Sequence, residues 1–155
     1  DIIMARSTFQ GIVRTNGGAR KGESTPGVVA ISEVVAFNPV GAAANVKVGT
    51  SHTTGENFIL PDNAVPVSFM TIGGATGGTN PTVDIGTAAD PDGFFNEVDA
   101  DTKGSLVGAA GALVVGAGIS GPVQVTANQG SSAATGGTTV GVFTYTIADD
   151  GSESN

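Results

Sequence analysis

The stretch TTVGVFTYTI, residues 138–147, decides the fold class of this chain. Its side chains alternate in size and polarity, which puts Phe143, Tyr145 and Ile147 on one face of an extended segment and two valines on the other. β-Branched and aromatic residues fit a pleated sheet and lose rotamer freedom in a helix. The stretch therefore predicts a β-strand.

Similar short runs, separated by turn-forming residues, occupy the chain from residue 28 onward. About seven to nine short strands, spaced by about 8–12 residues, are typical of a β-sandwich or a jelly roll. We therefore predict an all-β fold, a β-sandwich of jelly-roll type with an extended N-terminal arm. The predicted strands are residues 28–37, 45–49, 57–60, 65–72, 82–87, 113–115, 123–128 and 138–147.

One helix is predicted among the strands, and it begins at Asp90-Pro91-Asp92. An acidic N-cap followed by proline at the first helical position is a common start of a helix. Its inward-facing residues would be Phe94, Phe95 and Val98.

The composition excludes several classes of protein. The 155 residues include 25 glycines, 39% are hydrophobic and only 13% are charged, which excludes a helical bundle and a chain that is disordered throughout. The chain has no cysteine, so it has no disulfide framework and no thiolate metal site. The longest weakly apolar run, residues 106–119, is too short and too poor in large side chains to span a membrane, and we expect no membrane partner.

The charges divide the chain into three parts. Four of the six basic residues lie between Arg6 and Lys21, a stretch without acidic residues, so the rest of the chain has two basic against fourteen acidic residues. We predict a basic N-terminal arm over residues 1–26, one β-sandwich body over residues 27–148, and an acidic tail over residues 149–155. Because the acidic body would repel phosphates, we expect no nucleic acid partner.

The sequence contains no complete catalytic motif, and the chain is predicted not to be an enzyme. Residues 116–121 match the dinucleotide-binding pattern G-x-G-x-x-G, but Pro122 and an alternating strand follow where that motif needs a helix. His52 is the single histidine and lies among serine and threonine residues, as solvated loop residues do. No cofactor is therefore expected.

Four carboxylates, Asp90, Asp92, Asp99 and Asp101, are weak candidates for a metal site. Oxygen-rich loops of this kind bind Ca²⁺, but neither phase of the EF-hand pattern fits these residues. We predict no metal site, with a calcium site of another kind as the alternative.

Two segments carry a resemblance to a known family. The opening MARSTFQGIVR, residues 4–14, resembles the opening M-A-x-S-T-F-x-G-x-V-R of small virion proteins from cyanophages and related marine tailed phages. The segment PTVDIGTAADPDGF, residues 81–94, is similar to a stretch that recurs in phage head proteins. The chain thus resembles a tailed-phage capsid decoration protein, also called a cement protein. Asp1-Ile2-Ile3 depart from the pattern because they precede Met4.

This resemblance implies a structural virion protein, assembled in the host cytoplasm, that binds the outer surface of a phage capsid and stabilises it. Members of the class form β-rich homotrimers whose arms extend over the major capsid protein. The residues expected to make the capsid contacts of the arm are Phe9, Ile12, Arg14, Arg20 and Lys21.

The sequence leaves two alternative functions open. The first is a head-fibre or tail-fibre module that binds a host receptor or glycan through two Gly/Ser/Thr-rich loops, residues 73–80 and 129–137. The second is a calcium-dependent extracellular hydrolase or adhesin, which would use the carboxylates named above.

Overall fold

Strand β11 (Thr139–Ile147), which the sequence predicts most strongly, lies in the middle of a five-stranded sheet. Its residues alternate between buried and partly exposed positions, and it pairs antiparallel with β1 (Ala30–Phe37) on one side and β5 (Ala64–Gly74) on the other. A strand in this position has one face toward the core and one toward the outside, which matches its alternation.

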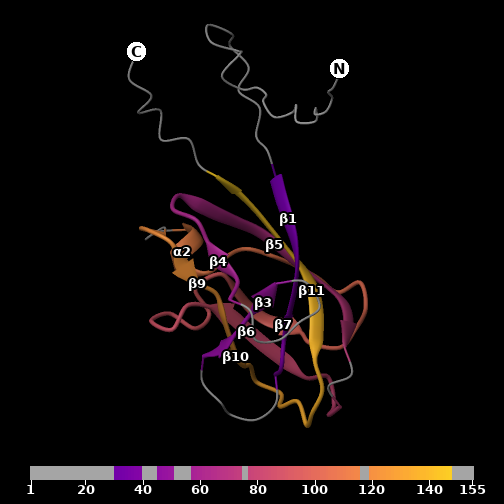
Figure 1. Ribbon diagram of the computed structural model, residues 1–155. Coiled ribbons are helices and arrows are strands. Elements are labelled where there is room, and N and C mark those ends of the chain that lie inside the picture. The colour runs from indigo at the N-terminus through magenta and orange to yellow at the C-terminus, as the bar shows by residue number, and fades with distance from the viewer. Residues whose placement is uncertain (1–29, 40–44, 51–56, 75–76, 116–118, 148–155) are drawn as a thin grey trace, which may run out of the picture.

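The computed structural model describes residues 30–39, 45–50, 57–74, 77–115 and 119–147 (Figure 1). The larger sheet has the order β3-β1-β11-β5-β8, the smaller sheet has the order β2-β10-β6-β7, and β4 and β9 form a separate two-stranded ribbon. The remaining elements are β2 (Val46–Lys47), β3 (Gly49–Thr50), β4 (Ile59–Leu60), β6 (Thr82–Gly86), β7 (Phe95–Asp99), β8 (Leu106–Gly108), α2 (Ala112–Val115), β9 (Val123–Gln124) and β10 (Thr126–Gln129). No helix in these ranges is long and apolar enough to cross a membrane.

An aromatic cluster lies in the hydrophobic core between the two sheets. Phe143 of the larger sheet lies at its centre, with ring centroids 5.2 Å from Phe95 of the smaller sheet and 5.1 Å from Phe58. Phe94 and Tyr145 lie 6.3 Å and 6.4 Å from the same ring. The rings meet edge to face, the geometry that aromatic quadrupoles favour. These contacts join both sheets into one core, and the prediction of an all-β sandwich is confirmed.

The strands pair in a nested order. β1 pairs with β11, β2 with β10, β5 with β8, and β6 with β7, and every pair is antiparallel. The earliest of these strands therefore pairs with the latest, and the two innermost strands pair with each other. The pairs β11–β5 and β10–β6 then join these ribbons into the two sheets.

The helix predicted to begin at Asp90 is wrong. The carbonyl oxygen of Asp90 accepts hydrogen bonds from the backbone N–H groups of Thr87 (2.9 Å) and Gly93 (3.1 Å), which closes a turn. The chain then continues as β7, which pairs with β6. An acidic residue before a proline also suits a turn, and burial of Phe94 and Phe95 between the sheets favours the strand.

The strand predicted at residues 113–115 is also wrong, because these residues belong to the short helix α2. The backbone N–H groups of Val114 and Val115 donate to the carbonyl oxygen of Gly111. Gly111 packs directly on the backbone of Gly93, where a side chain on either residue would collide with its neighbours. This close packing holds the Gly/Ala-rich segment against the turn before β7. The predicted arm, residues 1–26, and the predicted tail, residues 149–155, lie outside the described residues.

Candidate functional site

The two Gly/Ser/Thr-rich loops that the sequence marks as candidate binding loops lie against each other at one end of the sandwich. The Ser132 hydroxyl donates a hydrogen bond of 2.7 Å to the carbonyl oxygen of Thr79. Gly78 has a φ of 99°, and a Cβ there would lie 2.6 Å from the carbonyl oxygen of Ala133. Only glycine suits that backbone conformation at so close an approach. We call the described parts of these loops, residues 77–80 and 130–137, the loop pair.

Glu97 of β7 connects the loop pair to the smaller sheet. Its carboxylate accepts hydrogen bonds of 2.8 Å from both the backbone N–H and the hydroxyl of Ser131. Hydrogen bonds from the side chains of Thr82 and Ser131 lower the pKa of Glu97, so the residue is ionised at neutral pH. The contact therefore fixes the start of one loop by charge-assisted hydrogen bonds.

The backbone at Glu97 is unusual and explains how the carboxylate reaches the loop. Its φ is 55°, in the left-handed region that a glutamate rarely adopts. The pairing of β6 with β7 shifts register between Val83 and Ile85, and the N–H of Glu97 donates a 2.8 Å hydrogen bond to the carboxylate of Asp84. Such a β-bulge redirects a side chain that regular pairing would place elsewhere.

In the sequence, Glu97 lies within the acidic stretch 90–101, but it is not among the metal candidates named there. No local signal marks its contact with Ser131, because the contact depends on a bulge between two strands and on a loop 34 residues away. The loop pair itself offers hydroxyl groups and backbone donors and acceptors, which suit recognition of a polar ligand.

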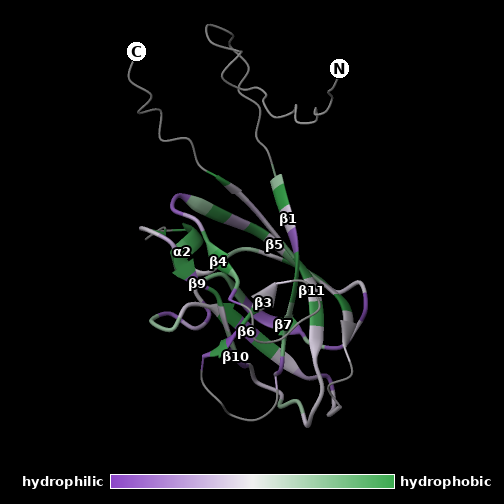
Figure 2. Ribbon diagram, viewed as in Figure 1, coloured by the Kyte–Doolittle hydropathy of each residue, from purple (hydrophilic) through white to green (hydrophobic). Residues whose placement is uncertain are grey.

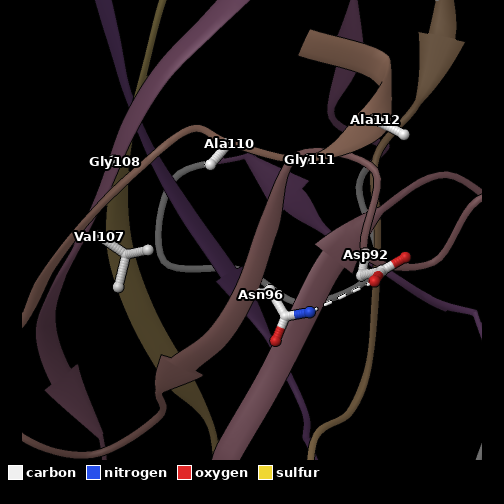
Figure 3. Close-up of a pocket in the computed structure, with 7 residues that line it drawn as sticks. All are labelled: Asp92, Asn96, Val107, Gly108, Ala110, Gly111 and Ala112. Carbon is white, nitrogen blue, oxygen red and sulfur yellow. Dashed lines mark hydrogen bonds between the residues drawn. The ribbon is translucent and has the colours of Figure 1, made fainter. Parts of the chain in front are cut away.

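A shallow hollow of about 290 Å³ lies between the edge strands of the two sheets, β7 and β8. Figure 3 shows Asp92 and Asn96 pointing toward each other in this hollow, where the amide of Asn96 donates a 3.3 Å hydrogen bond to the carboxylate of Asp92. The other residues that line it are small or apolar: Val107, Gly108, Ala110, Gly111 and Ala112. The polar side chains of the hollow are thus one carboxylate and one amide, hydrogen-bonded to each other.

The four candidate metal ligands lie at the two ends of β7, with Asp90 and Asp92 before the strand, Asp99 as its last residue and Asp101 after it. Asp99 accepts hydrogen bonds from the backbone N–H groups of Asp101 (3.1 Å) and Thr102 (2.7 Å), so its carboxylate stabilises a turn. Burial alone would raise the pKa of Asp99, but these hydrogen bonds lower it. Desolvation and its neighbour Asp92 raise the pKa of Asp90. Within the part of the chain that the structure describes, no three His, Cys, Asp or Glu residues lie close enough together to hold a metal ion.

The residues predicted to make the capsid contacts lie outside the described residues, and so does His52. The five arm residues are Phe9, Ile12, Arg14, Arg20 and Lys21.

Comparison with known proteins gives one structural resemblance. No family model matches the sequence, and no curated protein matches it. A solved structure described as "Cyanophage Pam1 capsid asymmetric unit" is similar to this chain, with 17% sequence identity and a TM-score of 0.48. The similarity covers 87% of this chain and 99% of that chain.

Proposed function

We propose that this chain is a structural virion protein that binds the outer surface of a phage capsid and stabilises it. The observation that carries the proposal is the nested pairing of eight strands in two sheets. This pairing supports a jelly-roll arrangement, an architecture that viral capsid and lectin domains use. Of these two uses, viral capsid and lectin, the resemblance of residues 4–14 and 81–94 to phage virion proteins favours the viral one.

The segment of residues 81–94 has a structural role in the sandwich. It includes β6 and the turn closed by Asp90, and it ends at Phe94, which is fully buried against Phe143. The proposal assigns the chain no catalytic step and no cofactor.

The arm would supply most of the affinity for the major capsid protein. Exposed ion pairs contribute only about 0–1 kcal/mol each, so Arg14, Arg20 and Lys21 alone would not anchor a single copy. Pairing of the arm backbone with a capsid strand would add affinity, with Phe9 and Ile12 in side-chain pockets. A homo-oligomer, predicted from the resemblance to be a trimer, would gain further affinity, on the order of 10²–10⁴ over one arm, by presenting several arms at once.

Deletion of residues 1–22 tests the proposal. We expect the shortened chain to keep the thermal unfolding transition of the full chain and to lose binding to capsids, measured by co-sedimentation with particles stripped of this protein. The full chain, added back to the same particles, is the control. Equal binding of the shortened and full chains would contradict the role of the arm, and absence of binding by the full chain would contradict the capsid role itself.

A second candidate function is a fibre module that binds a host receptor or glycan. The contact between the two loops of the loop pair favours it, because loops that meet at one end of a β-sandwich can form one binding surface. The two functions differ in where the protein lies on a particle. Copies spread over the whole shell support the capsid role, whereas copies confined to a vertex or to the tail support the fibre role.

A further inference from the structure

The outer face of the larger sheet carries an apolar row that crosses four strands. The register places Val34 of β1 beside Val142 of β11, Val142 beside Met70 of β5, and Met70 beside Leu106 of β8. The first three of these side chains are partly exposed, and Leu106 is 65% exposed. Figure 2 shows hydrophobic segments along β1, β5 and β11. We call this surface the outer row.

Among the described residues, the strands of the larger sheet place no charged side chain on this face. The strands β3, β5, β8 and β11 contain no charged residue, and β1 contains only Glu33. Glu33 lies opposite Phe143, whose other partner is Phe69, and both rings are fully buried, so Glu33 is on the inner side of the sheet. Glu33 also raises the pKa of the buried Tyr145, after the larger effect of burial.

The row of residues next to the outer row is polar but neutral. Ser32 lies beside Thr144, and Thr144 lies beside Ser68. The hydroxyl groups of Ser32 and Thr144 are hydrogen-bonded to each other at 3.0 Å. Their hydrogen-bonding capacity is thus partly used within the sheet, which makes this row easier to cover than a row of charged side chains.

The smaller sheet has the opposite character on its outer face. Its strands carry Lys47 and Asp84, and Glu97 is exposed next to Asp84. The described residues as a whole contain eight acidic and two basic residues. The outer row is therefore the uncharged part of an acidic molecule.

An exposed face of an antiparallel sheet usually carries polar side chains, and a contiguous apolar surface marks a site of interaction. The charge distribution indicates which partner covers it. Two copies of a chain with a net charge of −8 repel each other through most of their surfaces, but not through a face without charge. A two-fold interface brings the same patch of both copies together, so a neutral patch is self-complementary.

We propose that two copies of this chain pair face to face through the outer row of the larger sheet. The three long strands are about 4.8 Å apart and rise about 3.4 Å per residue, which gives an outline on the order of 400 Å² for each copy. Two such faces bury about 800 Å² in total, which is less than stable specific interfaces bury and falls in the range of weak, transient ones. The association is therefore reversible and depends on protein concentration. It does not depend on the proposed capsid function.

The mass of the full chain in solution tests this pairing. Sedimentation equilibrium over a range of concentrations should show a reversible change from the mass of one chain to twice that mass. Val142→Lys introduces like charges at the centre of the interface and should weaken association at least about tenfold. Ala133→Lys is the matched control, because it makes the same change of charge at an exposed residue of the loop pair and should leave association unchanged.

Leu106→Lys is a second variant that keeps the test valid if Val142→Lys does not fold. Leu106 is mostly exposed on a short edge strand, so its replacement leaves the core intact and should also weaken association. A full chain that stays at the mass of one chain at every concentration would overturn the proposal, and so would one that reaches three times that mass, the trimer that the resemblance to decoration proteins implies. So would a folded variant of either kind that associates as well as the full chain. Capsid binding is measured separately, so failure of the pairing is distinguishable from failure of the capsid role.

Discussion

Replacement of Phe143 by alanine should destabilise the protein more than any other single truncation of a side chain in β11. Phe143 is fully buried, and its ring lies within 6.4 Å of four other aromatic rings, two of which belong to Phe95, the first residue of β7, and Phe94 directly before it. Its loss leaves a cavity at the place where the two sheets meet. The rigid rings around it would relax only in part, because each is held by its own neighbours.

The expected cost is about 3–5 kcal/mol in the free energy of unfolding, the range for truncation of a buried phenylalanine to alanine. The cavity sits between rings rather than flexible side chains, which places Phe143 in the upper part of that range. Total stabilities of single domains are about 5–15 kcal/mol, so this one change removes a large part of the stability. For a chain of this length, the midpoint of thermal unfolding should fall by about 6–20 °C.

Chemical denaturation followed by circular dichroism measures this loss, with all variants at one low protein concentration because self-association would add stability. Ile147→Ala is the matched control. It lies in the same strand but is 43% exposed, and its truncation should cost about 1 kcal/mol or less. The reasoning would be refuted by a loss below about 1 kcal/mol for Phe143→Ala, or by equal losses for the two variants.

Two further predictions follow from the sheets. Gly141→Ala should lower the free energy of unfolding by about 1–3 kcal/mol, because the new Cβ would collide with the buried ring of Phe69. Gly108→Ala is the control and should cost little, because a Cβ at Gly108 has open space around it. Equal midpoints of denaturant unfolding for the two variants would contradict this prediction. Asp84→Asn should stabilise the protein at pH 7. Burial raises the pKa of Asp84, and the charge of Glu97 raises it further, so the ionised carboxylate costs stability. The asparagine oxygen can still accept the hydrogen bond from the backbone N–H of Glu97. A raised carboxyl pKa means that the wild type loses stability as pH rises through that pKa. The stability gained by Asp84→Asn should therefore shrink below about pH 4, where the wild-type carboxyl is protonated. A gain that is independent of pH would argue against this cause.

The parts of the fold that local pattern determines could be predicted from the sequence. Strands such as β11 and β6 alternate with a period of two residues, and burial of one face follows directly from that period. The helix expected at Asp90 shows the limit of local signals. The same acidic residue and proline suit a helix start and a turn, and the choice is made by Phe94 and Phe95, which are buried only when the turn brings β7 onto β6.

The candidate site was less predictable than the fold. The two loops could be selected by composition, but their contact depends on Ser132 and Thr79, which are 53 residues apart. The role of Glu97 depends on a left-handed backbone conformation that its residue type disfavours. The absence of charge from one sheet face could have been read from the strands alone, but only register shows that Val34, Val142 and Met70 form one row.

The two proposals are linked by the position of Ala30, the first described residue, in the larger sheet. Ala30 at the start of β1 pairs with Thr146 near the end of β11, so the N-terminal stretch attaches to the sheet that bears the outer row, at the end where β11 finishes (Figure 1). Two copies paired through this sheet would therefore present two arms from one assembly. Linked arms bind with a higher effective concentration than single arms. Val142→Lys should then weaken capsid binding without changing any arm residue, whereas deletion of residues 1–22 should abolish capsid binding and leave pairing intact. If Val142→Lys and the deletion of residues 1–22 weakened self-association and capsid binding to the same degree, one surface would have to serve both contacts.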